Sequence, residues 1–364
     1  MCIRDSSYTA ELSGEKKKKE SIWDLFKVRS VLKKRYGKVH VSFAEPIFLD
    51  NLLDEHDPEW RERASGKDEK PKWLTPLVNQ LGNDILEGIN KATHVNAVNL
   101  LAVILLTTRK LAMGREELED QLKLYLSLLT YDNYSDRITC TQRSPGEIVE
   151  YGIELGIIES RDNPLGDIIA VVPEQSVLLT YFRNNVAHLA AVPSLVTSCF
   201  LNARSMEARD VRRIAMAVYP FLKAELFLPW NEKAFKETVD GCLDWLLKHG
   251  LLVRHNEDGP LEKPEGGSRE DLQLRVMGHA LLQTFERYYI TVAVLAKNGS
   301  GKLSRSELER LCILTAQRIS QLKEFAAPEF YDRTQIRQFI TLRRDTGVLT
   351  TSEDDKLGVR GGVG

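Results

Sequence analysis

Histidine and carboxylate side chains are the residues of this 364-residue chain that could perform acid–base chemistry. A histidine held by a carboxylate can take the proton of an attacking hydroxyl group. Of the 7 histidines, only His40 has a carboxylate five positions later, at Glu45. The residues from Lys38 to Phe43 predict a strand, however, and positions five apart on a strand point to opposite faces. We therefore expect this pair not to be catalytic.

The same region contains the most informative motif of the chain, Val41-Ser-Phe-Ala-Glu-Pro-Ile47. Pro46 fixes its own backbone and restricts Glu45 to an extended conformation. Such a pair could give a fixed shape to the end of a strand. The alternative is that Pro46 only terminates the strand.

The Val41–Ile47 motif resembles the last of four sequence blocks of glycerolipid acyltransferases. Further strings, in the same order along the chain, are similar to bacterial membrane-associated glycerol-3-phosphate acyltransferases, and the resemblance extends from about Tyr8 to Thr350. These strings are Pro71-Lys-Trp-Leu-Thr-Pro76, Gly166-Asp-Ile-Ile169, Tyr181-Phe-Arg-Asn-Asn-Val-Ala-His188, Ala224-Glu-Leu-Phe-Leu228 and Ala327-Pro-Glu-Phe330.

The resemblance implies transfer of a fatty acyl group from acyl-carrier protein or coenzyme A to the first hydroxyl of sn-glycerol 3-phosphate. This reaction forms lysophosphatidic acid and begins phospholipid synthesis. The thioester is a co-substrate, and no other cofactor is implied. The implied location is peripheral, on the cytoplasmic face of the bacterial inner membrane.

The resemblance also places Phe43, Glu45 and Pro46 near the acyl or substrate channel, with Ala44 where the family usually has glycine. The family's base and acid are a histidine and an aspartate five positions later, and no histidine here has that partner. We therefore expect no catalytic residue in this chain. We expect it to be the C-terminal portion of such an enzyme, inactive by itself.

A polar stretch interrupts an otherwise apolar helical pattern at Arg183, Asn184, Asn185 and His188. Asn184 and His188 are four positions apart, so a continuous helix would place them on one face. We predict a hydrogen-bonding cluster against another domain. Arg183 as a ligand of the substrate phosphate is the alternative.

Glu15 to Lys38 holds ten Lys or Arg against three acidic residues and predicts a basic amphipathic helix. Such a helix can lie on an anionic membrane surface, and the resemblance favours this interpretation. It could instead be a solvated face over an ordinary core stripe, or a face for a phosphate substrate or an acidic carrier protein.

The rest of the chain predicts a mainly α fold. Helical patterns cover Thr75–Thr93, Asn96–Lys110, Arg115–Leu129, Gly146–Leu155, Glu174–Phe200, Met206–Leu228, Lys233–His249, Arg269–Lys297, Ser304–Phe325 and Thr334–Asp345. At Gly156, Gly250 and Gly347 a helical pattern ends and a short apolar run follows, which predicts small winged-helix-like strand pairs. The formal net charge of -2 argues against a nucleic-acid partner.

These patterns predict an order of segments along the chain. Residues 1–14 form a disordered or artefactual start, 15–50 the end of an α/β acyltransferase domain, 51–72 a linker, 73–350 a helical C-terminal domain, and 351–364 a disordered tail. The five cysteines are far apart, so we expect a reducing compartment, no disulfide and no metal site. The alternative function, from another class, is a noncatalytic helical scaffold on a membrane surface.

The longest apolar run, Val95 to Thr108, is too short to cross a bilayer and predicts a buried helix.

Overall fold

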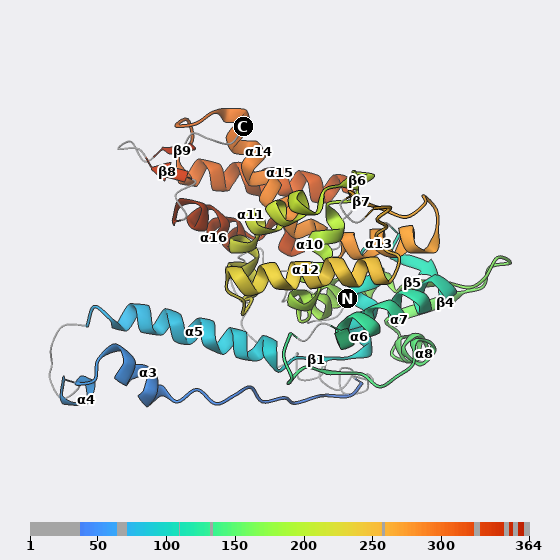
Figure 1. Ribbon diagram of the computed structural model, residues 1–364, viewed down its shortest axis with the longest axis horizontal. Coiled ribbons are helices and arrows are strands. Elements are labelled where there is room, and N and C mark those ends of the chain that lie inside the picture. The colour runs from blue at the N-terminus through green and yellow to red at the C-terminus, as the bar shows by residue number, and fades with distance from the viewer. Residues whose placement is uncertain are drawn as a thin grey trace, which may run out of the picture.

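The computed structural model describes residues 37–63, 71–108, 110–131, 134–256, 259–323, 328–345, 349–351 and 356–359. The described chain is mainly helical, as predicted, and its strands are short (Figure 1). The predicted basic helix lies outside the described residues except for its last two positions. Most of the predicted start and tail also lies outside them.

The helices are α3 (Leu49–His56), α4 (Trp60–Arg63), α5 (Leu74–Lys91), α6 (Ala97–Leu105), α7 (Arg115–Tyr131), α8 (Pro145–Glu154), α9 (Ser176–Asn184), α10 (Ala191–Ser198), α11 (Ala208–Leu226), α12 (Glu232–Lys248), α13 (Arg269–His279), α14 (Leu282–Asn298), α15 (Arg305–Lys323) and α16 (Arg333–Asp345). Short 3-10 helices are η1 (Pro173–Gln175), η2 (Ala187–Ala190) and η3 (Pro328–Tyr331). The strands are β1 (His94–Val95), β2 (Ala112–Gly114), β3 (Thr139–Cys140), β4 (Ile158–Arg161), β5 (Ile168–Val171), β6 (Ser205–Met206), β7 (Leu261–Glu262), β8 (Leu349–Thr351) and β9 (Leu357–Val359).

One arrangement occurs three times along the chain: a helix, a short strand segment, two helices and two more strand segments. In the first unit, α6, β2, α7 and α8 precede β4 and β5, and the sheet has the order β2-β5-β4. Gly156, at φ +66°, adopts the left-handed conformation predicted for the turn after α8. The strand pair predicted after Gly156 is present as β4 and β5.

The other two units repeat this order with shorter strand segments. In the second, α10, β6, α11 and α12 are followed by a bridge from Val253 to Glu262, and β6 pairs with β7. In the third, Ser304 bridges to Lys356 between α14 and α15, and β8 pairs with β9 after α16. The strand pairs predicted from the glycine positions are therefore present in the structure.

The first two units share one large hydrophobic core, and the third has a smaller core around Leu308, Cys312 and Phe330. Helix α6 is central to the large core, because all 9 of its residues are buried. This confirms the buried helix predicted from the longest apolar run. In the described part of the chain, no helix has the length and apolar character to cross a membrane.

The single helix predicted from Glu174 to Phe200 is wrong, because the chain breaks it into α9, η2 and α10. Pro193 supplies a reason, since a proline inside a helix removes a backbone hydrogen bond and clashes with the preceding turn. Starting a new helix at Ala191 places Pro193 in the first turn, where proline is tolerated.

The helix predicted from Arg269 to Lys297 is also broken, between α13 and α14. Ser194 on α10 stabilises the break, because its Oγ donates to the Gly278 carbonyl at 3.3 Å and accepts from the Leu281 amide at 3.0 Å. A tertiary contact thus provides the hydrogen bonds that continuous helix would have made.

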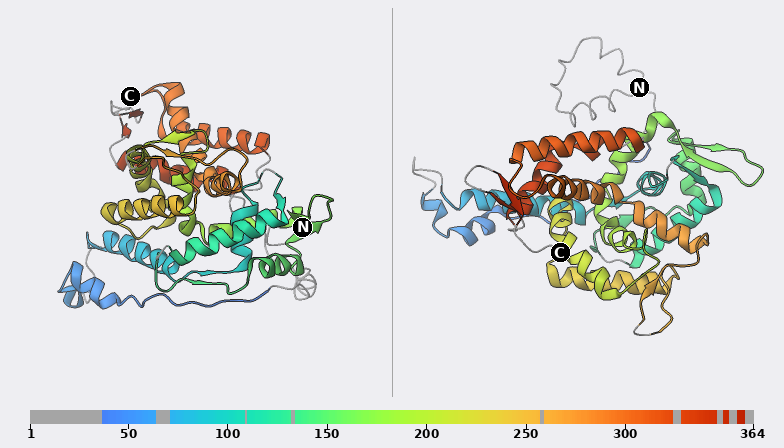
Figure 2. Two further views of the ribbon diagram at one scale, coloured as in Figure 1. Left: turned by 45° about the vertical axis from the view of Figure 1, so that its right-hand side comes forward. Right: turned by 90° about the horizontal axis from the view of Figure 1, so that it is seen from above.

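The strand predicted at residues 38–43 is absent, because these residues pair with no other described strand. The segment predicted as a linker contains most of α3 and all of α4. Residues 37–48 instead run as one long irregular segment towards α3, which packs beside α5 (Figure 1). We call α3, α4 and α5 the arm, because they lie together at one side of the large core (Figures 1 and 2).

Candidate functional site

A groove of about 540 Å³ lies between the Val41–Ile47 motif, the C-terminal half of α5 and the residues before β3. Its lining residues are Ala44, Glu45, Pro46, Ile47, Phe48, Asn51, Leu52, Asp84, Glu87, Gly88, Lys91, Ser135, Asp136 and Arg137. Two of the three residues predicted for the channel, Glu45 and Pro46, therefore line a groove. Phe43 does not, and its side chain is 81% exposed.

Arg137 contacts the motif from a position 92 residues later in the chain. Its Nη2 lies 3.2 Å from Glu45 Oε1, and its Nη1 donates to the Phe43 carbonyl oxygen at 3.5 Å. Sequence reasoning missed Arg137, because nothing local marks an arginine as the partner of a distant glutamate.

The charge of the groove argues against a phosphate site within the described residues. Four carboxylates line it, against the two cations Lys91 and Arg137. Both cations already face carboxylates: Arg137 pairs with Glu45, and Lys91 Nζ lies 3.7 Å from Glu87 Oε2. A phosphate dianion would meet net negative charge here. The residues of the groove can therefore form one side of a substrate channel, but they include no unpaired cation for a phosphate.

The inner side of the motif segment packs on β1 and α5. The ring of His40 stacks on that of His94 with centroids 3.6 Å apart, and Ala44 lies against Gly88. His94 Nδ1 is 2.7 Å from Thr139 Oγ1 on β3. Burial lowers the pKa of His94, and the neighbouring charge of His40 lowers it further. His40 thus has a packing role here.

Replacing His40 with alanine should raise the pKa of His94. The substitution removes the charged neighbour and exposes more of the His94 ring to water, and both changes favour the imidazolium form. Titration of the histidine ring protons by NMR would measure the shift, with His56→Ala as the control on the arm. An unchanged or lower His94 pKa would contradict the stacked arrangement.

The predicted polar cluster is divided by the end of α9. Asn184 closes α9, Asn185 is its C-cap, and His188 lies in η2, so Asn184 and His188 do not share one helix face. Arg183 is buried and directs its guanidinium to Asn184 Oδ1 and to Gln283 Oε1 on α14, at 3.3 Å. It does not line the groove beside the motif.

His188 joins the core to the base of the arm. Its Nε2 lies 3.2 Å from the carbonyl oxygen of Asn90 on α5, and because a carbonyl only accepts, this nitrogen bears the hydrogen. The Asn90 side chain donates in turn to the Leu226 carbonyl at 2.7 Å. Burial lowers the pKa of His188 to about 4, so the ring is neutral at pH 7.

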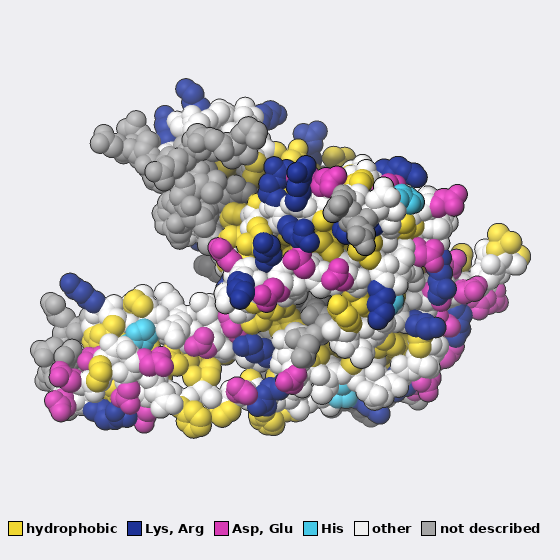
Figure 3. All heavy atoms as spheres, viewed as in Figure 1, with side chains coloured by type: hydrophobic (Ala, Val, Ile, Leu, Met, Phe, Trp, Pro, Cys, Tyr) yellow, Lys and Arg dark blue, Asp and Glu magenta, His cyan; other side chains and the backbone are white. Residues whose placement is uncertain are grey.

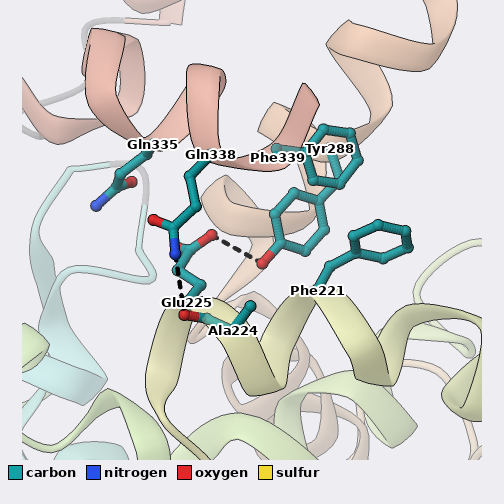
Figure 4. Close-up of a pocket in the computed structure, with 7 residues that line it drawn as sticks. All are labelled: Phe221, Ala224, Glu225, Tyr288, Gln335, Gln338 and Phe339. Carbon is teal, nitrogen blue, oxygen red and sulfur yellow. Dashed lines mark hydrogen bonds between the residues drawn. The ribbon is translucent and has the colours of Figure 1, made fainter. Parts of the chain in front are cut away.

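A second buried polar group joins α11, α14 and α16 (Figure 4). Glu225 accepts from the guanidinium of Arg287, which is 4% exposed, and from the Tyr288 hydroxyl at 2.8 Å. Gln338 donates to the Ala224 carbonyl at 3.2 Å. The adjoining cavity of about 10 Å³ has room for about one water molecule. This group is structural, because no substrate would fit.

Comparison with known proteins places these features in a family. Residues 8–352 match the family described as "Glycerol-3-phosphate acyltransferase C-terminal region". The chain is 45% identical over 358 residues to a protein of Xanthomonas campestris pv. campestris named "Glycerol-3-phosphate acyltransferase", a match that covers 98% of this chain and 40% of the relative.

Proteins with the same name from Xylella fastidiosa (strain M12) and Pseudomonas entomophila are 44% and 38% identical, again over 98% of this chain. The match covers 42% of the first and 43% of the second. The chain therefore spans about two fifths of the length of the curated relatives that it matches.

Proposed function

Because the chain belongs to the glycerol-3-phosphate acyltransferase C-terminal region family, we propose that it is part of an enzyme that acylates glycerol 3-phosphate. The reaction transfers a fatty acyl group from a thioester of acyl-carrier protein or coenzyme A to the sn-1 hydroxyl and forms lysophosphatidic acid. The observation that supports this proposal most strongly is 45% identity to a relative of that name over 98% of the chain.

In this proposal, the Val41–Ile47 motif forms a wall of the substrate channel. Glu45 and Pro46 line the groove, and Arg137 pairs with the Glu45 carboxylate. Because the groove lining has a net negative charge, we assign the motif a role in positioning the substrate and not in binding its phosphate. The general base and the cations for the phosphate belong, in this account, to the part of the longer relatives outside the match.

The acyl donor and the location are further proposals. We propose that the donor is a coenzyme A or acyl-carrier-protein thioester, used without another cofactor. We also propose that the enzyme works peripherally at the cytoplasmic face of the bacterial inner membrane. The ten Lys or Arg residues between Glu15 and Lys38 support attraction to anionic lipid.

The role of Pro46 can be tested in a joined protein, in which the unmatched region of the Xanthomonas campestris relative is fused to this chain. Pro46→Ala should lower kcat/KM for glycerol 3-phosphate on the order of tenfold, because the freed backbone no longer holds the channel wall. Formation of radiolabelled lysophosphatidic acid is the readout. Pro164→Ala, at an exposed turn before β5, is the matched control. Full activity of a folded Pro46→Ala protein would contradict the proposed wall.

A further inference from the structure

We propose that His188 is a positioning residue for the groove, because it joins the two chain segments that form the groove beside the motif. The inference rests on the proposed function and adds a residue that acts on the substrate channel without touching the substrate. His188 belongs to the polar string at residues 181–188, which are all described and none of which lines the groove. The proposal gives this string a role.

Two segments that are far apart in the sequence form the groove beside the motif. The first is the C-terminal half of α5, with Asp84, Glu87, Gly88 and Lys91, and the second consists of Ser135, Asp136 and Arg137. In the first segment, Gly88 lies against Ala44 of the motif. In the second segment, Arg137 bonds to Glu45. The position of the motif therefore depends on how the two segments lie relative to each other.

The buried ring of His188 reaches both segments. Its Nε2 donates to the carbonyl of Asn90, which directly precedes the groove residue Lys91. The ring also meets that of Tyr134 edge-on, with centroids 5.1 Å apart, and Tyr134 directly precedes Ser135. His188 and Tyr134 are 3% and 7% exposed, and neither lines the groove. His188 can therefore act on the groove only through its neighbours.

The two segments are also joined at a second place, because they continue into β1 and β3, which pair in parallel. A single connection would let the segments rotate about it, whereas two connections at different places fix their relative orientation. The pairing begins at His94, and the bond from His188 reaches Asn90, four positions earlier. The contacts of His188 therefore oppose rotation of α5 away from the second segment.

Asn90 strengthens this connection with its own side chain. Its carbonyl is one of the last four of α5, which receive no hydrogen bond from a following helical turn. Its Nδ2 donates to the Leu226 carbonyl at 2.7 Å and to the Phe227 carbonyl at 3.4 Å. Phe227 ends α11 in the left-handed conformation, at φ +51°. Bonds from two different parts of the core thus meet at the end of α5.

The end of α5 has a large effect on the groove because the helix has few other supports. Leu77 is the single buried residue among the 18 described residues of α5, and the main packing partner of the helix is α3 of the same arm. Helix α5 reaches the core with its C-terminal end, and the face shown in Figure 3 is hollowed beside the outer part of the arm. A small rotation at Asn90 would therefore displace Gly88 and the motif that lies against it.

The test begins with the joined protein, in which the unmatched region of the Xanthomonas campestris relative is fused to this chain. His188→Leu should lower kcat/KM for glycerol 3-phosphate on the order of tenfold, because leucine cannot donate to the Asn90 carbonyl. The loss should fall on kcat, with KM changed less than about twofold, since the groove orients the substrate and does not bind its phosphate. His188→Gln keeps a donor and should retain at least about half of the unmodified kcat.

Two controls separate positioning from loss of stability. His249→Leu removes another histidine at a helix end, where Nδ1 lies 2.9 Å from the Trp245 carbonyl, and His249 does not line the groove. Leu308→Ala removes a fully buried side chain from the core of the third unit and lowers stability there. Both proteins should keep kcat and KM within about twofold of the unmodified values.

A second measurement uses this chain alone and does not depend on activity. Hydrogen–deuterium exchange with mass spectrometry should show exchange at least about fivefold faster in residues 86–93 and 134–140 of the His188→Leu protein, with α15 unchanged. The His188→Gln protein should match the unmodified chain. His188→Phe is the second variant if His188→Leu does not fold, because phenylalanine keeps a ring against Tyr134 but donates no hydrogen bond. It should speed exchange in residues 86–93.

Several results would overturn the proposal. A folded His188→Leu or His188→Phe protein with the unmodified kcat would show that His188 does not position the groove. An equal loss of kcat in the Leu308→Ala protein, or faster exchange spread over the whole chain, would assign His188 a role in stability alone. If the unmodified joined protein formed no lysophosphatidic acid, the proposed function would fail. The exchange measurement would then decide by itself whether His188 joins the two segments.

Discussion

Glu225→Ala is expected to lower the free energy of unfolding by about 3 to 5 kcal/mol, the usual cost of removing one partner of a buried ion pair. Arg287, 4% exposed, would keep its charge without the carboxylate that accepts from it. The Tyr288 hydroxyl would lose its acceptor as well. Urea unfolding followed by tryptophan fluorescence would measure the change.

Two further variants make this test specific. Glu225→Gln combined with Arg287→Met removes both charges and should restore much of the lost stability, because no unpaired charge remains buried. Glu237→Ala removes an exposed carboxylate of α12 and should change stability by less than about 0.5 kcal/mol. If Glu225→Ala stayed within about 1 kcal/mol of the unmodified chain, the buried group would not be holding α11 to α14 and α16.

The second large effect is a loss of stability in acid that depends on His188. The pKa of His188 is about 4 in the folded protein, below the ordinary 6.5, so the unfolded chain binds the proton more readily. The stability that depends on a neutral His188 is complete above pH 6.5 and is lost as the pH falls towards 4. The pKa difference corresponds to a loss of about 3 kcal/mol in the free energy of unfolding over that range.

His188→Gln should remove this pH-dependent component, since glutamine can still donate to the Asn90 carbonyl but does not titrate. The measurement is the free energy of unfolding at several pH values between 7.5 and 4, for the variant and the unmodified chain. His255→Gln, with a side chain 72% exposed, is the control and should leave the pH dependence as it is. Identical slopes for His188→Gln and the unmodified chain would contradict a buried neutral ring.

The sequence predicted helices and turns correctly where they are stabilised by contacts between residues close together in the chain. Helix α6 follows from its apolar run, and its start is fixed by a capping box between Asn96 and Asn99. Helix α8 begins in the same way at Ser144. Gly156 and Gly250 marked the turns before the strand pairs because they adopt positive φ.

The errors arose where distant residues decide the structure. The break between α13 and α14 depends on the hydroxyl of Ser194, more than eighty positions away. The strand predicted at residues 38–43 has the side-chain pattern of a strand but no backbone partner among the described residues. The alternation of side chains indicates that a segment could be a strand, but it does not show whether a neighbouring strand is present to pair with it.

The candidate site was only partly predicted, because residues distant in the sequence complete it. The resemblance pointed to Glu45 and Pro46, and both line the groove, but no local pattern indicated Arg137 or the net negative charge of the groove. The polar residues near His188 were visible as a group, whereas their division between α9, η2 and the base of α5 was not. The pairing of Glu225 with Arg287 likewise joins positions 62 residues apart.

The most direct test of the account is an acylation assay with radiolabelled glycerol 3-phosphate and palmitoyl-coenzyme A. It compares this chain alone with the same chain fused to the unmatched region of the Xanthomonas campestris relative. We predict no lysophosphatidic acid above background from the chain alone and clear formation from the fused protein. Turnover by the chain alone, or a folded fused protein without activity, would contradict the account.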